Sequence, residues 1–582
     1  MEKRWVLKKT TDKEAVKQLS SALNISERLS ALLVQRGIKT FEEAKRFFRP
    51  SLKYLHDPFL MKDMDKAVNR ILQAHENGEK IMVYGDYDVD GTTAVALVYS
   101  FLKRFHKKIE FYIPDRYKEG YGISYAGIDF AIKQGASLLI TLDCGIKAVE
   151  KVDYARENGL EIIICDHHRP GETLPAAAAV LDPKQPGCHY PFKDLSGCGV
   201  GFKLAQAIAM KRGDSENTVF SGLDLVAVSI AADIVPITGE NRVLAYYGLK
   251  KINEKPRAGI RVLFHSAGVE KNGEKGSLFF DREITINDLV FLIGPRINAA
   301  GRIEDATDSV RLLISRDDDY AWKLGKQINE LNLTRRDLDT GITSEAIEIL
   351  QKDKNHRDKK TTVVYKETWH KGVIGIVASR LIEVFYRPTI VLTRSEGLIT
   401  GSARSIKSFD IYDALDSISH LLEHFGGHTY AAGLALRPEN LDRFIEEFEK
   451  YASERLTDDM MVPEIEIDEE LYISDINTKF FKILKQFAPF GPGNMSPYFQ
   501  TRNVIDTGYV KLVGKNGSDH LKFSVVHPDH TGGPLPAIAF NQGHHFNDMR
   551  TGRPFSICYH IDENYWQGQT TLQLRIKDIK FD

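Results

Sequence analysis

Short apolar segments alternate with helix-length segments from about residue 65 to residue 235. The apolar segments are rich in β-branched residues and predict strands at 81–84, 109–113, 138–142 and 162–165. Such alternation is typical of βαβ units that build a mostly parallel sheet. Because these segments are apolar on both faces, we expect helices on both sides of the sheet, as in a doubly wound α/β domain.

A long helical segment separates this region from a second α/β pattern. Residues 305–352 contain no proline and carry apolar side chains at helical spacing, which predicts one long helix or two that bridge domains. The second pattern predicts strands at 362–365 and 389–393 and helices at 373–385, 412–422 and 440–454. We expect a second α/β domain here.

The two ends of the chain have patterns of their own. Residues 1 to about 55 are polar and helix-patterned, chiefly at 22–36 and 41–48. After a turn-rich joint at 489–494, strands are predicted at 509–513, 521–526, 537–540, 554–561 and 570–576. Five short strands in some 85 residues are typical of a small barrel such as the OB-fold.

These patterns predict a multidomain α/β protein with five parts. They are an N-terminal helical extension (1–60), a first α/β domain (61–304), connecting helices (305–358), a second α/β domain (359–455) and a C-terminal five-stranded OB-like barrel (456–582).

Composition excludes several classes of protein. The 582 residues are 42% hydrophobic and 27% charged, which excludes collagen-like, disordered and disulfide-scaffold proteins. Basic and acidic residues number 78 and 80, so only a local basic groove could mark a nucleic-acid site. Five cysteines without a C-x-x-C motif favour a reducing, cytoplasmic compartment. No secretory signal is visible, and no apolar run approaches the ~18 residues of a membrane span.

Three aspartates, Asp86, Asp88 and Asp90, alternate directly after the first predicted strand. In extended backbone, alternate side chains project to one side, so all three could converge on one point. Clustered carboxylates repel one another unless a cation neutralises them, which favours a metal site. A solvated turn is the alternative, because Asp and Gly are common in turns.

Later segments end in the same kind of residue. Asp143 follows the strand at 138–142, Asp166-His167-His168 follow the strand at 162–165, and Asp233 ends another apolar run. Singly, such residues are more often helix caps or packed histidines. Together they meet where the carboxyl ends of parallel strands meet. Oxygen and imidazole ligands without thiolates favour two Mn²⁺ or Mg²⁺ ions, a pair suited to phosphoryl chemistry.

These motifs resemble those of the DHH phosphoesterase superfamily, and the sequence around them resembles its bacterial single-strand-specific DNA exonucleases. Further matching stretches lie at 114–122, 196–200, 295–302, 401–405, 426–428 and 490–494. The resemblance spans about residues 80 to 495. It implies a metal-dependent exonuclease that degrades single-stranded DNA from the 5′ end to 5′-mononucleotides in repair and recombination, with a metal-activated water as nucleophile.

The resemblance also implies roles for individual residues. Metal ligands would be Asp86, Asp88, Asp90, Asp143, His167 and Asp233. Within this set Asp143 would bridge the ions, and whether Asp90 is a ligand or a supporting acid stays open. The catalytic centre would comprise Asp88, Asp143, His167 and His168, with His168 either at the scissile phosphate or behind a ligand. Asp166 would orient a histidine, since metal-bound imidazoles need an acceptor.

The second α/β domain resembles the DHHA1 domain that accompanies such catalytic domains. The resemblance implies that Ser402, Arg404 and His428 hold the terminal 5′ phosphate, because arginine offers a bidentate fork for phosphate. Arg116 and one of Arg296 or Arg302 are further candidates, for which a surface ion pair is the alternative. A narrow cleft between the two domains would admit a single strand and exclude a duplex.

The C-terminal barrel and the partners complete the expectation. OB-folds bind single strands by stacking and a basic groove, for which the candidates are Lys511, Lys515, Lys522, Tyr565 and Trp566. The resemblance implies a monomer that meets single-stranded DNA, a single-strand-binding protein and a RecQ-type helicase, and no membrane. The alternatives are a DHH phosphodiesterase for oligoribonucleotides or cyclic dinucleotides, and a metal-free replication scaffold.

Overall fold

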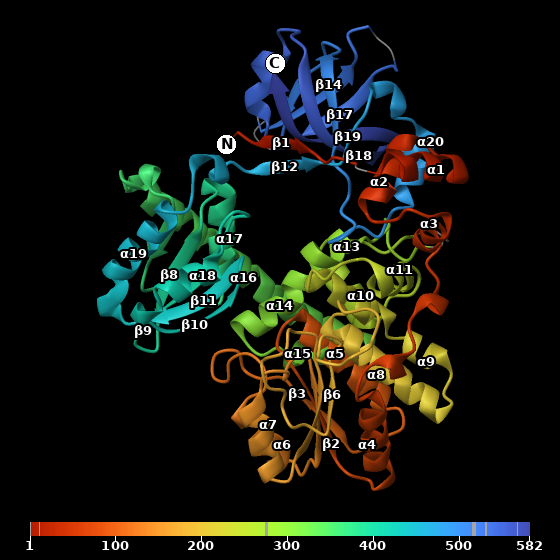
Figure 1. Ribbon diagram of the computed structural model, residues 1–582, viewed down its shortest axis with the longest axis vertical. Coiled ribbons are helices and arrows are strands. Elements are labelled where there is room, and N and C mark those ends of the chain that lie inside the picture. Colours follow the sequence, from red (N-terminus) through yellow and green to blue (C-terminus); the bar gives the residue numbers. More distant parts are fainter. Residues whose placement is uncertain are drawn as a thin grey trace. The chain divides into compact units, whose positions relative to one another are not determined.

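The computed structural model describes residues 2–10, 12–273, 278–514, 519–529, 532–566 and 569–581. The chain forms two compact units (Figure 1). The first comprises Met1–Leu55, Ile234–Tyr246 and Glu464–Asp582, and the second comprises His56–Asp233 and Tyr247–Pro463. Within the described residues, every helix is too short or too polar to cross a membrane.

The second unit contains a five-stranded, all-parallel sheet with the order β3-β2-β4-β5-β6. Its strands are β2 (Ile81–Gly85), β3 (Ile109–Tyr112), β4 (Leu138–Leu142), β5 (Glu161–Cys165) and β6 (Ala179–Leu181). Four of them lie where the sequence predicts strands, whereas β6 was not predicted. The chain leaves β2 in one direction to form β3 and returns to place β4 on the other side. Ligands bind at the carboxyl ends of strands beside such a switch point.

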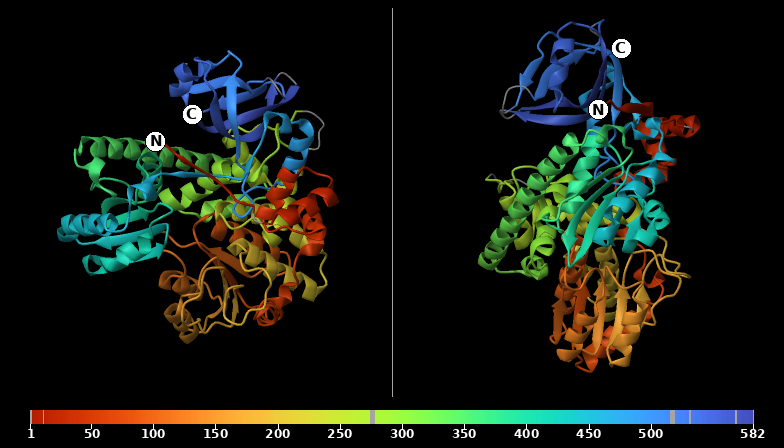
Figure 2. Two further views of the ribbon diagram at one scale, coloured as in Figure 1. Left: turned by 45° about the horizontal axis from the view of Figure 1, so that its top comes forward. Right: turned by 90° about the vertical axis from the view of Figure 1, so that its left-hand side faces the viewer.

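Helices cover both faces of this sheet, as the apolar strands predict (Figures 1 and 2). One face carries α6 (Tyr125–Lys133) and α7 (Val149–Glu157), whose apolar residues share a core with the strands. On the other side lie α4 (Met64–Glu76), α5 (Val89–Leu102), α8 (Gly197–Arg212), α9 (Glu216–Phe220) and α10 (Leu223–Ala232). Helix α5 is buried around nearly its whole circumference because the sheet, α8, α10 and α15 (Thr307–Ile314) all pack on it.

A helical layer continues the second unit. It comprises α11 (Gly239–Glu254), which begins in the first unit, α12 (Ala258–Ser266), α13 (Ile286–Asp288), the π-turn η3 (Leu289–Ile293), α14 (Gly294–Ile303), α15 (Thr307–Ile314) and α16 (Asp318–Lys352). The proline-free segment forms one helix, α16, of 35 residues. Its buried Asp339 pairs with Arg335 of the same helix (2.8 Å) and with Arg380 of α17 (Ile374–Phe385; 2.6 Å). The pair with Arg380 connects α16 to α17, which packs on the second sheet.

The second sheet has the order β10-β11-β9-β8-β7. Its elements are β7 (Thr362–Tyr365), α17 (Ile374–Phe385), β8 (Thr389–Ser395), β9 (Leu398–Arg404), α18 (Ile411–Ser417), β10 (Leu422–His428), β11 (Ala431–Leu436) and α19 (Leu441–Ser453). The helix predicted at 412–422 is too long, because Leu422 already pairs with Leu436 of β11. Strand pairing with β11 therefore decides the conformation of this segment.

The C-terminal part of the first unit is a closed five-stranded barrel. Its strands are β14 (Phe499–Asp506), β16 (His520–Val526), β17 (Leu535–Ala539), β18 (Phe555–Trp566) and β19 (Gln569–Phe581), closed by pairing of β14 with β16. The sequence predicts five strands but includes β15 (Lys511–Val513), which only extends the sheet, and misses β14. A bulge between Thr501 and Val504 breaks the alternation of buried residues in β14, which hides its pattern.

The N-terminal segment belongs to the same unit as the barrel. Strand β1 (Arg4–Leu7) pairs in parallel with β12 (Glu464–Ile467). Helices α1 (Lys13–Leu23), α2 (Glu27–Gln35) and α3 (Phe41–Phe48) share one core with the barrel, α20 (Thr478–Lys485) and α21 (Phe546–Met549). The helix predicted at 22–36 is two helices, because Asn24 adopts the left-handed conformation (φ 53°). The predicted extension is thus part of a folded unit.

Candidate metal centre and phosphate-binding cavity

The three alternating aspartates lie in a loop and a helix start, not in extended backbone. Asp88 is the N-cap of α5 and accepts from the N–H of Gly91 (3.0 Å), so Asp90 already lies in the first helical turn. Any side chain at Gly91 would collide with the main chain of Asp86. The tight Asp-Gly turn therefore brings the carboxylates to the carboxyl end of β2 without the strand geometry that the sequence predicts.

Asp86 is buried and only partly satisfied. Its Oδ1 accepts weakly from the N–H of Gly122 (3.3 Å), and within the described residues its Oδ2 has no hydrogen-bond partner. Burial, and then the charge of Asp88, raise the pKa of Asp86 well above its usual range. Burial and the charge of Asp90 likewise raise the pKa of Asp88. Arg116 lowers the pKa of Asp86 and His168 lowers that of Asp88, but burial and the neighbouring carboxylates outweigh these two charges.

Asp143 lies at the end of β4, in the left-handed conformation (φ 61°). Its Oδ1 is 3.1 Å from Nε2 of His167. A Cβ on Gly197, the first residue of α8, would lie 2.6 Å from the Asp143 side chain, so only glycine permits this approach. Burial, and then the charge of Asp90, raise the pKa of Asp143 well above its usual range. Strained backbone of this kind is typical of functional positions.

His167 joins the carboxylates into one cluster. Its Nε2 lies 3.6 Å from Oδ2 of Asp233 and 3.7 Å from Oδ2 of Asp90. Burial lowers the pKa of His167, which favours the neutral imidazole that metals bind. Asp233 is the C-cap of α10, and burial followed by the charge of Asp90 raises its pKa to about 8. Donor atoms within 4.8 Å of one another form two sets: Asp143, His167 and His168, and Asp90, His167 and Asp233.

Asp166 supports the adjacent histidines. Its Oδ1 accepts from Nδ1 of His168 (2.7 Å) and from the N–H of His167 (2.8 Å), and its Oδ2 accepts from the N–H of Ile146 (2.9 Å). Burial alone would raise the pKa of Asp166, but the hydrogen bond and charge of His168 outweigh it and lower the value to about 2. Conversely, Asp166 overcomes the effect of burial on His168 and raises its pKa. The ring is thereby fixed, with Nε2 at 3.2 Å from the hydroxyl of Tyr121.

Both oxygens of Asp90, like those of Asp166, are engaged in hydrogen bonds. Asp90 accepts from the N–H groups of Gly197 (2.6 Å) and Cys198 (2.7 Å) and from the hydroxyl of Ser229 (2.7 Å). These donors come from the N-terminus of α8 and from α10. Asp90 therefore anchors two helices to the acidic edge, the cluster of Asp86, Asp88, Asp143, His167 and Asp233 at the carboxyl end of the sheet. The sequence left open whether Asp90 is a metal ligand or a supporting acid, and these hydrogen bonds favour the supporting acid.

The cluster fits divalent cations. Asp86, Asp88, Asp143 and Asp233 have raised pKa values, and both Oδ2 of Asp86 and Nδ1 of His167 lack a partner within the described residues. Buried carboxylates in this state are costly unless a cation lies between them. Oxygen donors and a neutral imidazole are the ligands that Mn²⁺ and Mg²⁺ use.

The raised pKa values predict how acidity affects the protein without divalent cations. A carboxyl group whose pKa is higher in the folded state stabilises the fold below its unfolded pKa, and this stabilisation is lost as pH rises. For Asp233 the loss runs from about pH 4 in the unfolded chain to about 8 in the folded one. In EDTA, Tm should therefore fall by several degrees between pH 5 and pH 8. Mn²⁺ should restore it at pH 8, and Asp233→Asn should reduce the difference; a Tm indifferent to both pH and Mn²⁺ would contradict the site.

A second feature of the same unit is a cavity of about 490 Å³ lined by cations. Its charged lining residues are Arg116, Arg302, Lys371 and Arg404, and none of the described residues that line it is acidic. Burial, followed by the charge of Arg116, lowers the pKa of Arg302 to about 10. Such uncompensated positive charge is suited to a phosphate.

Short contacts hold the cavity together. Arg302 donates from Nη1 to the carbonyl of Gly372 (3.1 Å), and the hydroxyl of Tyr117 donates to the carbonyl of Arg302. Arg404 donates from Nη1 to the hydroxyl of Ser402 (3.0 Å). The guanidinium of Arg116 lies 5.0 Å from the ring centre of Tyr87, which also lines the cavity. Because Tyr87 stands between Asp86 and Asp88 in the chain, the cavity adjoins the acidic edge.

Only some of the predicted phosphate contacts line this cavity. Arg116, Arg302, Ser402 and Arg404 line the cavity. Arg296 does not: it is buried and donates to Asn329 and to two main-chain carbonyls. His428 is exposed at the end of β10 and is absent from the lining, whereas His424 of the same strand is present. Arg302 is therefore the arginine of the pair that lines the cavity, and His424 rather than His428 is the histidine of β10 in its lining.

Several residues at these sites escaped the sequence analysis. His424 lies two residues before Gly426, so strand alternation could have identified it. Lys371 precedes α17 in a His-Lys-Gly loop without a recognisable pattern. Lys184 follows the unpredicted β6 and donates to the carbonyl of His167 (2.6 Å). In the barrel, Lys511 pairs across strands with Lys522. Lys515 and the side chains of Tyr565 and Trp566 lie outside the described residues.

Three family models match the chain. They are described as the DHH family N-terminal domain (residues 80–230), the DHHA1 domain (358–454) and the RecJ OB domain (467–578). Their order is that of the first sheet with its helices, the second sheet and the barrel.

Relatives match almost the whole chain. It is 38% identical over 577 residues to the single-stranded-DNA-specific exonuclease RecJ of Bacillus subtilis strain 168, covering 99% of this chain and 70% of that protein. It is 32% identical over 571 residues to the protein of the same description from Escherichia coli K12, covering 95% of each. The crystal structure of RecJ in complex with Mn²⁺ from Thermus thermophilus matches with a TM-score of 0.83 and 27% identity, over 100% of this chain and 80% of that one.

Proposed function

Because the chain belongs to the RecJ family of single-stranded-DNA-specific exonucleases, we propose that it hydrolyses single-stranded DNA from the 5′ end to 5′-mononucleotides. The proposed 5′-to-3′ direction of hydrolysis rests on one observation. Tyr87 joins the acidic edge to a cavity whose four charged lining residues are all cations. An end-binding pocket beside a hydrolytic centre gives an enzyme that removes terminal nucleotides.

Two divalent cations, Mn²⁺ or Mg²⁺, complete the acidic edge in this proposal. Asp86, Asp88, Asp143, His167 and Asp233 would hold them, and Asp90 would support the set through α8 and α10. Both cations are found in crystal structures of Thermus thermophilus RecJ. When bound, such ions supply an activated water and neutralise charge on the phosphoryl oxygens.

The protein's own residues orient the strand. Arg116, Arg302, Lys371, Arg404 and the hydroxyl of Ser402 bind the terminal 5′ phosphate, for which guanidinium groups provide paired donors. When the phosphate is in the cavity, the first phosphodiester lies toward Asp86 and Asp88, the two residues that flank Tyr87 in the chain.

His168 acts at the scissile phosphate in this proposal. Its raised pKa favours the imidazolium, which donates a proton in a hydrogen bond to a phosphate oxygen. Asp166 positions it through the 2.7 Å bond to Nδ1. Tyr121, whose hydroxyl lies 3.2 Å from Nε2, closes the other side of the ring.

Family membership favours this function over the two alternatives. A metal-free scaffold would lack ligands, whereas the complete acidic edge is present here. A phosphodiesterase for small substrates would not need the OB barrel that the RecJ OB model matches at residues 467–578. We further propose a role in DNA repair and recombination in the cytoplasm as a monomer, and contacts with a single-strand-binding protein and a RecQ-type helicase.

The test uses 3′-labelled single-stranded oligonucleotides with and without a 5′ phosphate, in Mn²⁺. A label-bearing ladder that shortens progressively is the expected result, and blunt duplex should resist. Immediate release of the label as a mononucleotide would mean attack from the 3′ end and would overturn the polarity. Turnover of dinucleotides without degradation of longer strands would favour the small-substrate alternative.

A further inference from the structure

Arg296, which does not reach the cationic cavity, lies beneath a second hollow in the same unit. Its guanidinium donates from Nε to Oδ1 of Asn329 (3.0 Å) and from Nη2 to the carbonyl of Ser266 (3.0 Å). Nη1 donates to the carbonyl of Leu292 (2.7 Å). Asn329 and Ser266 are two of the five residues that line a hollow of about 380 Å³. A side chain that is only 8% exposed therefore fixes two walls of this hollow.

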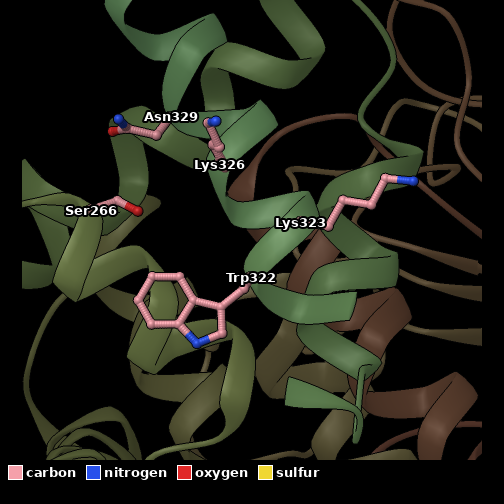
Figure 3. A pocket seen from close by; sticks show the side chains of 5 residues that line it. All are labelled: Ser266, Trp322, Lys323, Lys326 and Asn329. Atoms are coloured by element: carbon pink, nitrogen blue, oxygen red, sulfur yellow. The ribbon is translucent and has the colours of Figure 1, made fainter. Parts of the chain in front are cut away.

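Helix α16 supplies the remaining walls. Trp322, Lys326 and Asn329 are spaced at i, i+4 and i+7, which places them on one face of the helix. Lys323 completes the lining. Figure 3 shows the indole at one end of the hollow, Lys326 and Asn329 at the other, Ser266 beside them, and Lys323 extending away.

The indole of Trp322 is exposed to solvent and is held in place by a neighbouring ring. Trp322 is 46% exposed although it is a large aromatic residue. The ring of His265 braces it edge-on, with ring centres 4.9 Å apart and an angle of 76°. A braced but exposed indole offers a surface for stacking at little cost in side-chain entropy.

The charge of the hollow is positive. Within the described chain, neither Lys323 nor Lys326 forms an ion pair, and none of the five lining residues is acidic. Two acids on neighbouring elements are already paired, Asp318 with Arg261 (2.6 Å) and Glu270 with His265 (3.4 Å). Burial, and then the charges of Arg336 and Arg335, lower the pKa of Arg296. An aromatic surface beside uncompensated cations is the combination that binds single-stranded nucleic acid.

We propose that this hollow is a second binding site for the DNA strand, which takes one nucleotide. The base stacks on Trp322, and the flanking phosphates lie at Lys323 and Lys326. Asn329 and Ser266 offer polar groups to the base edge. The proposal rests on the proposed function and extends it, because this site takes no part in hydrolysis.

Helix α14 relates the two sites. It carries Arg302 into the cationic cavity and Arg296 beneath the hollow. Six residues of helix correspond to about 9 Å along the axis and about 240° around it, so the two side chains leave α14 in different directions. A strand whose 5′ end fills the cavity therefore has to extend beyond the cavity to reach the hollow. The hollow should increase affinity for long strands and leave very short ones unaffected.

The test compares strand lengths. Trp322→Ala and the double variant Lys323→Ala/Lys326→Ala are measured by fluorescence anisotropy in EDTA with 5′-phosphorylated, 3′-labelled oligo-dT of four and thirty nucleotides. We expect about a tenfold loss of affinity for the long strand, the scale of a lost base–aromatic stack, and no loss for the short one. The double variant should also lower the slope of log affinity against log salt by about 1.4, which is about 0.7 for each of the two phosphate contacts.

Matched controls lie on the same helix. Tyr320→Ala removes an aromatic side chain that is 44% exposed but lies outside the hollow. Lys352→Ala/Lys354→Ala removes the same charge at the last residue of α16 and in the turn that follows it. Both should bind like the wild type. Unchanged affinity of the hollow variants for the long strand, or an equal loss for both lengths, would overturn the proposal.

A crosslinking experiment identifies the occupant. A thirty-nucleotide strand with 5-iododeoxyuridine in its 3′ half should crosslink to the peptide that contains Trp322. Free dTMP that displaces this crosslink would support nucleotide recognition and make the reaction product a second ligand. If the strand did not crosslink and a poly-glutamate peptide bound the hollow instead, the hollow would be assigned to an acidic protein segment. This result would overturn the proposal. These readouts need no hydrolysis. A protein without nuclease activity would therefore contradict the proposed function but would leave the test of the hollow unaffected.

Discussion

Asp143→Asn should lower the rate of single-strand hydrolysis by about 10²- to 10³-fold, the usual cost of losing a single group that stabilises charge at a hydrolytic centre. Asp143 belongs to one of the two sets of donor atoms, and its Oδ1 lies 3.1 Å from Nε2 of His167, the residue that both sets share. The amide preserves the shape of the side chain but removes the negative charge that a divalent cation requires. Single-turnover degradation of a 3′-labelled strand in saturating Mn²⁺ measures the loss.

Thermal unfolding separates this catalytic effect from a folding defect. In EDTA, Asp143→Asn should melt at or above the wild-type Tm, because it removes one negative charge from a buried cluster of carboxylates. In Mn²⁺ it should gain less stability than the wild type. Asp129→Asn, which changes an exposed carboxylate of α6 bonded to Tyr154, is the control and should behave like the wild type. If Asp143→Asn melted far below the wild type in EDTA, its inactivity would reflect misfolding and the assignment would fail.

Arg404→Ala should remove most of the advantage that a 5′ phosphate gives to a substrate. A hydrogen bond to a charged group contributes about 1.5–3 kcal/mol, which corresponds to about 10- to 100-fold in kcat/KM. We expect that loss on 5′-phosphorylated strands and little change on strands with a 5′ hydroxyl. Burial lowers the pKa of Arg404, and its Nη1 lies 3.0 Å from the hydroxyl of Ser402, so the guanidinium is held in place before substrate arrives.

The ratio of kcat/KM for the two kinds of 5′ end is the measurement, because it cancels general defects. Arg394→Ala serves as control: this arginine lies on the neighbouring strand β8, half exposed and paired with Glu367 (2.8 Å). Its ratio should equal that of the wild type. An Arg404→Ala protein that lost activity equally on both ends would show that the cavity does not recognise the terminal phosphate.

Much of the fold followed from local patterns. Strands β2, β4 and β7 and helix α17 lie within about a residue of their predicted positions, because buried parallel strands and amphipathic helices leave strong periodic signals. Strands β9, β10 and β14 were missed. Gly401, Gly426 and Gly427 weaken the strand pattern of β9 and β10, and a bulge interrupts β14.

The gathering of the acidic and histidine side chains at one edge of the sheet was predictable for a related reason. Asp86, Asp143 and His167 each follow a buried parallel strand, and the carboxyl ends of such strands meet at one edge whatever the rest of the fold does. Sequence alone did not distinguish Asp90 from the other proposed ligands, because its hydrogen bonds to Gly197, Cys198 and Ser229 come from helices distant in the chain.

By itself, the sequence determined the order of domains, the acidic edge and the chemistry that its side chains can support, since these depend on residues close together in the chain. Only the tertiary structure decided which arginine faces the phosphate cavity. Arg296 and Arg302 lie in the same motif and the same helix, but six residues of helical rotation send one to Ser266 and Asn329 and the other to Gly372. Such choices depend on which distant elements pack around a helix, and no local pattern records them.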